Sequence, residues 1–193
     1  MKIWNLPNQL TLSRILLVPV VLVLLALETK WTCLFSFVLF ALASFTDLVD
    51  GYLARRGGQV TNLGKLLDPL ADKVLVTSVL IMLVELDWVS AWIAIIIICR
   101  DMMVTGLRAM AADSGVVIAA DKYGKLKTLL QLLALGPLIL HYPWFGLPLA
   151  AIGQILLYIA LALTVFSGVN YFVVFFKAQY SVKPDVETQS KDE

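Results

Sequence analysis

Four aspartates lie close together in the sequence and could bind metal ions jointly. Asp47 and Asp50 are three residues apart, and Asp68 and Asp72 are four residues apart. Residues at these spacings share one face of a helix, so each pair projects from one side of its own helix. Carboxylate oxygens, with no His or Cys nearby in the sequence, favour Mg²⁺ or Mn²⁺ over zinc or copper. The four acids therefore predict a two-ion site that could hold a pyrophosphate during displacement at phosphorus.

Small and basic residues accompany these acids. Gly51, Ala54 and Gly64 leave room for a ligand or a neighbouring backbone to approach. Arg55 offers a bidentate donor to phosphate. Each of these residues alone is more often explained by helix packing or by anchoring at the membrane interface. As a set beside four carboxylates, they favour a phosphate-binding site.

The acids belong to a strongly apolar chain. Of its 193 residues 60% are hydrophobic and 15% charged, and the mean hydropathy is +0.87, which indicates an integral membrane protein. Six apolar stretches are long enough to cross about 30 Å of hydrocarbon. They cover residues 11–27, 32–54, 66–86, 88–112, 125–142 and 147–176. We expect an all-α fold of six transmembrane helices in one domain, residues 1–180, followed by a polar, disordered tail, residues 181–193.

The distribution of basic residues predicts the orientation. If all six stretches cross the membrane, every Lys and Arg except Lys30 falls at or near one side. The positive-inside rule makes that side cytoplasmic, together with both termini and the aspartates at the ends of the second and third helices. Because a charge near the bilayer centre costs about 2.5–3.5 kcal/mol or more, the buried acids indicate function. A net charge of +1 gives no reason to expect nucleic acid as a partner.

The pattern D-x2-D-G-x2-A-R-x8-G-x3-D-x3-D resembles the signature of the CDP-alcohol phosphotransferases. Every fixed position is filled, by Asp47, Asp50, Gly51, Ala54, Arg55, Gly64, Asp68 and Asp72. The resemblance implies a six-helix membrane fold, two bound divalent ions, a CDP-linked lipid as donor and a homodimer. It also implies that Asp47, Asp50 and Asp68 are metal ligands, and that Asp72 is both a ligand and the general base.

The same resemblance suggests residues that bind the CDP-lipid. It implies contacts to the CDP moiety from Gly51, Arg55 and Thr61, beside the small residues Ala54 and Gly64. The N-terminal segment NLPNQLTLSR is similar as well, which implies that Asn8 and Thr11 help to close over the nucleotide. A turn followed by a helix cap explains Asn8 and Thr11 equally well.

Basic residues later in the chain suggest the acceptor. Arg100 follows the apolar run AWIAIIIIC, so its charge needs Asp101, an aspartate of the metal site or an anionic ligand. Arg108 lies two helical turns further on and hence on much the same face. Lys125 and Lys127 stand at the start of the fifth helix. A basic pocket beside a metal site favours an acceptor that is itself a phosphate ester.

Two further segments, RDMMVTGLR and GKLKT, resemble those of the bacterial members of the family that use glycerol 3-phosphate. The resemblance implies transfer of the phosphatidyl group from CDP-diacylglycerol to sn-glycerol 3-phosphate in the bacterial cytoplasmic membrane. It implies that Arg100, Arg108, Lys125 and Lys127 hold the acceptor phosphate. Asp101 stands where we expect Glu, so its reach differs but its charge does not.

Other functions remain open from the sequence. Within the family, the acceptor could be inositol phosphate, serine or phosphatidylglycerol. In a different class, the acids could line the path of a divalent-cation transporter, although no repeat of interrupted helices supports this. A purely structural membrane protein offers no reason to bury four acids.

Overall fold

The computed structural model describes residues 6–57, 62–113, 122–144 and 146–182, and within these the side chains of 6–11, 47–57, 62–70, 72, 112–113, 122–123, 125 and 178–182 lie outside the described part. The described residues form six α-helices, in agreement with the predicted all-α architecture. They are α1 (Leu6–Ala26), α2 (Lys30–Gly57), α3 (Asn62–Glu85), α4 (Ala91–Asp113), α5 (Lys122–Leu140) and α6 (Leu149–Val182).

Several helices extend beyond the apolar stretches that predicted them. α1 begins at Leu6 rather than at residue 11, and α6 continues to Val182 rather than stopping at residue 176. A helix satisfies its own backbone polar groups, so it can continue into polar sequence where lipid no longer requires apolar side chains. Residues 183–193 lie outside the described residues, and the disorder of the tail stays a prediction.

The helices present apolar side chains to their surroundings. The segment Leu149–Lys177 of α6 is long and apolar enough to cross a membrane. Large side chains such as Leu16, Phe45 and Trp92 are exposed, by 65%, 65% and 74%. Apolar surface on this scale suits lipid better than water. The protein is an integral membrane protein.

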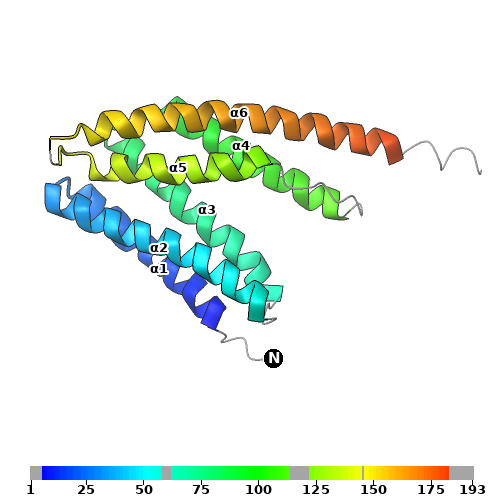
Figure 1. Ribbon diagram of the computed structural model, residues 1–193, viewed down its shortest axis with the longest axis horizontal. Helices are drawn as coiled ribbons and strands as arrows, with labels where there is room; N and C mark the ends of the chain where they lie inside the picture. The colour runs from blue at the N-terminus through cyan, green and yellow to red at the C-terminus, as the bar shows by residue number, and fades with distance from the viewer. Residues whose placement is uncertain (1–5, 58–61, 114–121, 145, 183–193) are drawn as a thin grey trace, which may run out of the picture.

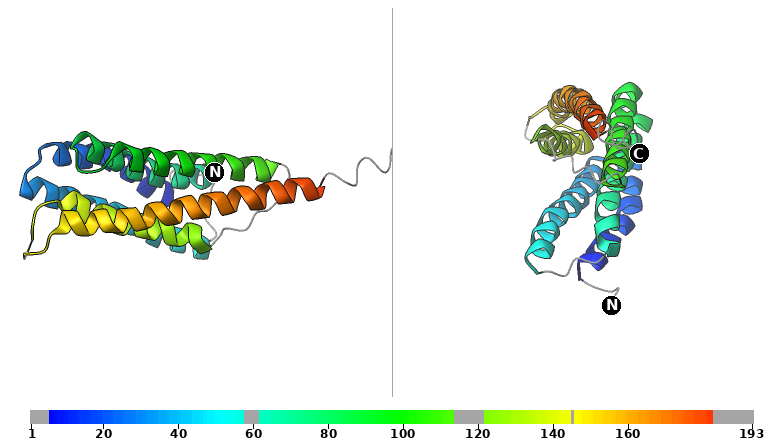
Figure 2. Two further views of the ribbon diagram at one scale, coloured as in Figure 1. Left: turned by 90° about the horizontal axis from the view of Figure 1, so that it is seen from above. Right: turned by 90° about the vertical axis from the view of Figure 1, so that its right-hand side faces the viewer.

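The six helices form two groups of three. α1 packs on both α2 and α3, whereas α6 packs on both α4 and α5. Contacts of α3 with α4 and α5, and of α2 with α5, join the groups. The groups meet near the α5–α6 loop and diverge toward the end where α1 begins and α6 terminates (Figure 1). The end-on view of Figure 2 shows α5 and α6 together on one side and α1 and α2 on the other.

Glycines allow the closest helix contacts. A Cβ atom on Gly153 of α6 would lie 2.7 Å from Leu138 Cγ and 2.9 Å from the Leu138 backbone nitrogen on α5. A Cβ atom on Gly136 of α5 would lie 3.0 Å from the ring of Phe37 on α2. Close packing at small residues is a main source of helix association in a bilayer, where lipid removes most of the hydrophobic driving force.

The three helices that run toward the α5–α6 loop all end in the same way. Glu28 after α1, Asp87 after α3 and His141 after α5 have positive φ angles of 50°, 57° and 46°. This left-handed conformation costs a non-glycine residue about 1–2 kcal/mol, so contacts around these turns must hold it. The turns are linked to one another: the Tyr142 hydroxyl donates to the Glu28 carbonyl oxygen, and the His141 ring stacks on Trp88 with 3.7 Å between centroids.

Tryptophans complete this cluster. The ring of Trp144 lies edge-on to Trp31, with 5.9 Å between centroids, and the Lys30 ammonium lies 4.4 Å from the Trp144 centroid. The residues Trp31, Trp88, His141, Tyr142 and Trp144 form what we call the aromatic cluster. It fastens the three connections at this end of the bundle.

We expect Gly153→Ala to loosen the α5–α6 contact, because the added methyl group would meet backbone as well as side-chain atoms of Leu138. Overpacking of this kind costs about 1–3 kcal/mol and should lower the melting temperature in detergent by roughly 3–10 °C. The matched control is Gly106→Ala on α4, where an added Cβ meets nothing within 4 Å. If both variants melt alike, the close contact at Gly153 does not matter for stability.

Candidate active site

The backbone carries the two aspartate pairs to the same end of the bundle. Asp47 and Asp50 lie in the last turns of α2, and Asp68 and Asp72 lie in the first half of α3. α2 and α3 are in contact, and both ends lie away from the aromatic cluster (Figure 1). The four side chains lie outside the described part, so the metal site stays a prediction. Among the side chains that are described, no group of three or more His, Cys, Asp or Glu residues gathers.

Most of the remaining residues expected at the CDP-lipid site belong to the end of α2 or to the starts of α1 and α3. Gly51, Ala54 and Arg55 lie near the end of α2, and Gly64 lies in the first turn of α3. Asn8 and Thr11 belong to the start of α1, whose described core packs on α2 and α3. Thr61 lies outside the described residues. The side chains of this set, like that of Lys125 on α5, are not described either.

A pocket of about 370 Å³ opens between α3, α4 and α5. Its wall contains apolar side chains such as Leu80 and Ile97, neutral polar ones and charged ones. The charged and amide side chains that line it are Lys73, Arg100, Asp101, Arg108, Lys127 and Gln131. Four cations and one carboxylate give the described lining a net positive charge. Such a lining suits a phosphate monoester, which carries a charge of about −1.5 to −2 at neutral pH.

Arg100 is held in this wall by contacts from two helices. Its side chain is buried, and one guanidinium nitrogen lies 3.1 Å from Asp101 Oδ1. The other donates to Ser167 Oγ on α6 over 2.7 Å. The aliphatic part of Arg100 lies against Gly168, where a Cβ atom would come within 3.0 Å of Arg100 Cγ. Of the three partners expected for Arg100, an adjacent acid, an aspartate of the metal site or an anionic ligand, the structure shows the first, Asp101.

Lys127 shares the same carboxylate. Its ammonium group pairs with Asp101 Oδ1, and its side chain is 4% exposed. One carboxylate thus holds two buried cations from α4 and α5. Because two positive charges face one negative charge, the group retains an excess positive charge, which an anionic ligand can neutralise.

The other two cations lie closer to the aspartate-bearing end of α3. Lys73 donates to the Thr105 hydroxyl, which in turn donates to the Asp101 backbone carbonyl over 2.7 Å. Lys73 directly follows Asp72, so the pocket begins beside that aspartate's backbone. The Arg108 guanidinium lies 5.4 Å from the ring centroid of Tyr171 on α6, within the range of a cation–π contact. The structure therefore brings Arg100, Arg108 and Lys127 to one pocket, and their binding of an acceptor phosphate stays a prediction.

Sequence reasoning missed several residues of this pocket. The sequence gives a reason to expect Lys73 in the pocket, because it stands next to Asp72. It also gives a reason to expect Gln131 there, because Gln131 lies four residues after Lys127 and hence on the same helix face. Ser167 and Gly168 had no signal of their own: they are small residues in the long apolar run of α6, and only the packing of α4 against α6 brings them to Arg100.

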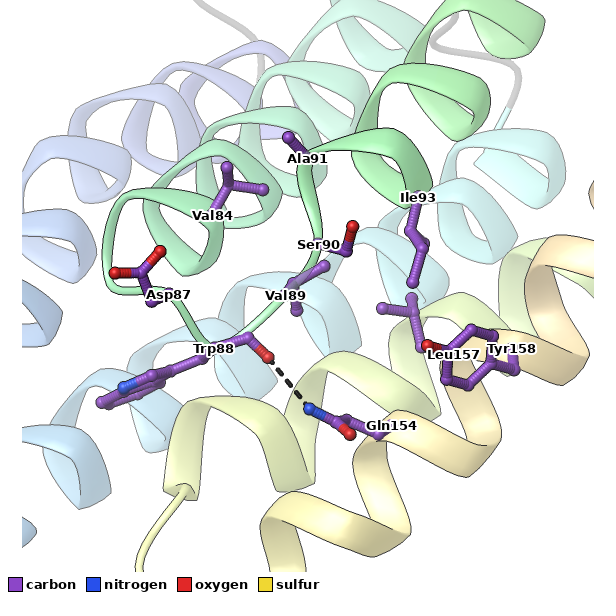
Figure 3. Close-up of a pocket in the computed structure, with 10 residues that line it drawn as sticks. All are labelled: Val84, Asp87, Trp88, Val89, Ser90, Ala91, Ile93, Gln154, Leu157 and Tyr158. Carbon is purple, nitrogen blue, oxygen red and sulfur yellow. Dashed lines mark hydrogen bonds between the residues drawn. The ribbon is translucent and has the colours of Figure 1, made fainter.

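A second pocket, of about 330 Å³, lies at the opposite end of the bundle between the α3–α4 turn and α6 (Figure 3). Gln154 donates there to the Trp88 carbonyl oxygen over 3.3 Å. Asp87 is the one charged side chain in its described lining, and no cation lines it. An anionic substrate is therefore better served by the basic pocket between α3, α4 and α5.

Comparison with known proteins places the chain in a family. The family model described as CDP-alcohol phosphatidyltransferase matches residues 4–166. A protein of Bacillus subtilis named CDP-diacylglycerol–glycerol-3-phosphate 3-phosphatidyltransferase is 43% identical over 181 residues, which cover 88% of this chain and 94% of the relative. A protein of the same name from Haemophilus influenzae is 40% identical over 176 residues, covering 89% and 93%.

A third relative carries a similar name. A protein of Mycobacterium tuberculosis named probable phosphatidylglycerophosphate synthase is 40% identical over 176 residues, covering 88% of this chain and 81% of the relative. The matched region includes both aspartate pairs and the helices that form the basic pocket. The chain belongs to the CDP-alcohol phosphatidyltransferase family.

Proposed function

We propose that the protein transfers the phosphatidyl group of CDP-diacylglycerol to sn-glycerol 3-phosphate, releasing CMP and forming phosphatidylglycerophosphate. The names of relatives that are 40–43% identical over most of the chain support this reaction. The observation that carries the choice of acceptor is the pair of buried cations, Arg100 and Lys127, in a pocket that begins beside Asp72. An acceptor without a phosphate would leave these cations without an anionic ligand.

The donor half of the site consists of acids and small residues. Asp47, Asp50, Asp68 and Asp72 hold two Mg²⁺ or Mn²⁺ ions; carboxylates on two contacting helices are the hard ligands that such ions prefer. When bound, these ions neutralise the pyrophosphate and stabilise the oxygen of the leaving group. The residues that bind the CDP moiety are Asn8, Thr11, Gly51, Ala54, Arg55, Thr61 and Gly64.

The transfer step needs a base and a fixed acceptor. Asp72 accepts the proton of the primary hydroxyl of glycerol 3-phosphate as its oxygen attacks the lipid-bearing phosphorus. The bond from that phosphorus to the CMP oxygen breaks, and CMP leaves with the electron pair. Arg100, Arg108, Lys125 and Lys127 hold the acceptor phosphate, so the hydroxyl is positioned before the reaction and the barrier falls mainly through orientation.

In this proposal the chain spans a membrane and binds both substrates on one side of it. All six helices cross the bilayer; at about 1.5 Å per residue, even the 19 residues of α5 span close to 30 Å. Both termini and the site lie on the cytoplasmic side of the bacterial inner membrane, as the positive-inside rule requires. Two copies of the chain form a homodimer, as the family resemblance implies.

Asp68→Asn should lower the rate of CMP release at least about a hundredfold in the presence of Mg²⁺ or Mn²⁺, because a neutral amide binds these ions poorly. The melting temperature should stay close to that of the wild type. Asp87→Asn, an acid removed at the opposite end of the bundle, is the control and should retain full activity. Full CMP release by Asp68→Asn would refute the metal site.

The acceptor is tested with purified protein, CDP-diacylglycerol and one alcohol at a time. We expect CMP release with sn-glycerol 3-phosphate and little with serine, inositol phosphate or phosphatidylglycerol, since only the first combines a primary hydroxyl with a small phosphate monoester. The lipid product is identified by mass spectrometry. Turnover with serine but not with glycerol 3-phosphate would show that the acceptor assignment is wrong.

Gly168→Ala should weaken acceptor binding, because the added Cβ would press on Cγ and Nε of Arg100, at 3.0 and 3.4 Å. Displacing the guanidinium from Ser167 loses a hydrogen bond to a charged group, so the KM for glycerol 3-phosphate should rise about tenfold. The KM for CDP-diacylglycerol should not change. Gly106→Ala again serves as the control, and an unchanged acceptor KM in Gly168→Ala would exclude this positioning role.

A further inference from the structure

Gln131 is a buried amide in the wall of the basic pocket. It lies on α5, four residues after Lys127, and its side chain is 3% exposed. Its Nε2 atom has no hydrogen-bond partner among the described residues. A buried amide N–H without a partner costs about 1–3 kcal/mol, and such groups are rare in native structures. This donor is therefore available, as far as the described residues go, for a hydrogen bond to a ligand in the pocket.

The neighbouring polar groups are already engaged. Arg100 is bonded to Asp101 and Ser167, Lys127 is paired with Asp101, and Lys73 donates to Thr105. One further buried donor in this pocket lacks a partner in the described part of the chain, the Nε of Arg100. Two open donors on cation-rich walls suit a ligand with several anionic oxygens.

The direction of α5 fixes where along the pocket Gln131 lies. α5 runs from the end that carries the aspartates toward the aromatic cluster (Figure 1). Gln131 is thus about 6 Å further from the reacting end than Lys127, one helical turn along the axis. Lys73, next to Asp72, marks the opposite limit of the pocket. A ligand whose hydroxyl lies near Asp72 and whose phosphate meets Arg100 and Lys127 would point its phosphate toward Gln131.

We propose that Gln131 donates its side-chain N–H to the phosphate group of the acceptor, as a neutral donor at the inner limit of the pocket. This proposal rests on the proposed function, because it takes the acceptor to be a phosphate monoester. A neutral amide adds a hydrogen bond without adding a further cation to a wall that already has four cations and one carboxylate. Gln131 thus helps to select acceptors that carry a phosphate.

The test replaces Gln131 by methionine, which has a similar length and volume but no N–H group. In Gln131→Met, the KM for glycerol 3-phosphate should rise about tenfold, because one hydrogen bond to a charged group is lost. The kcat and the KM for CDP-diacylglycerol should stay within about twofold, because the amide does not touch the donor. Gln131→Leu, which also lacks the N–H, gives the same readout if the methionine variant is poorly produced.

A second readout does not depend on turnover. Glycerol 3-phosphate should raise the melting temperature of the wild type, and this shift should shrink in Gln131→Met. The melting temperature of the free variant should equal or exceed that of the wild type, since an apolar group of the same shape removes an unpaired buried amide. Gln154→Met, in the other pocket, is the matched control and should change neither KM nor the shift.

The outcomes separate the two proposals. A KM for glycerol 3-phosphate within twofold of the wild-type value in Gln131→Met overturns the role of Gln131 while leaving the proposed function intact. A change in the KM for CDP-diacylglycerol instead would mean that Gln131 contacts a lipid headgroup phosphate, and would also overturn it. If the wild-type protein releases no CMP with glycerol 3-phosphate, the proposed function is refuted. The phosphate contact is then tested with inorganic phosphate. If phosphate raises the melting temperature of Gln131→Met as much as that of the wild type, the contact is refuted as well.

Discussion

The basic pocket depends on the ion pairs that the Asp101 carboxylate forms with two buried cations. This carboxylate pairs with Arg100 of its own helix and with Lys127 of α5, and both cations are buried. Without a shared counter-ion, two buried cations would repel each other and would each carry a large desolvation cost. With it, they stay charged between helices and still leave one positive charge unbalanced. The ion pairs of Arg100, Asp101 and Lys127 therefore link α4 to α5. Their net positive charge can be neutralised by an anionic ligand.

Under the proposed function, this arrangement assigns the donor and the acceptor to different halves of the chain. The first three helices carry the aspartates, whose negative charge suits metal ions and a pyrophosphate. The last three carry the cations Arg100, Arg108 and Lys127, whose charge suits a second phosphate. α3 belongs to the first half, yet it lines the basic pocket through Lys73 and contacts both α4 and α5. A donor and an acceptor that are both anionic can thus lie side by side, each opposite its own countercharge.

The sequence predicted the parts of this design that depend on local patterns. Six apolar runs marked six helices, and the cost of an unpaired charge after AWIAIIIIC predicted an anionic partner for Arg100, with Asp101 as one of three candidates. It did not predict the contacts of Ser167 and Gly168 with Arg100, because these contacts depend on where α6 crosses α4. In the sequence, a small residue that contacts lipid cannot be distinguished from one that contacts a guanidinium group. Helix ends were also misjudged, since hydropathy marks the span in lipid and not the limits of backbone hydrogen bonding.

Contacts at the opposite end of the molecule hold the two groups of helices together, although the groups diverge at the end that carries the aspartates. At the opposite end, three turns held in left-handed conformations are tied by the Tyr142–Glu28 hydrogen bond and the stacking of His141 on Trp88. The close contact at Gly153 continues this packing along α5 and α6. The two groups of helices are joined at this end of the bundle and diverge at the other (Figure 1). The left-handed turns cost free energy, and the hydrogen bond and ring stacking between them offset that cost.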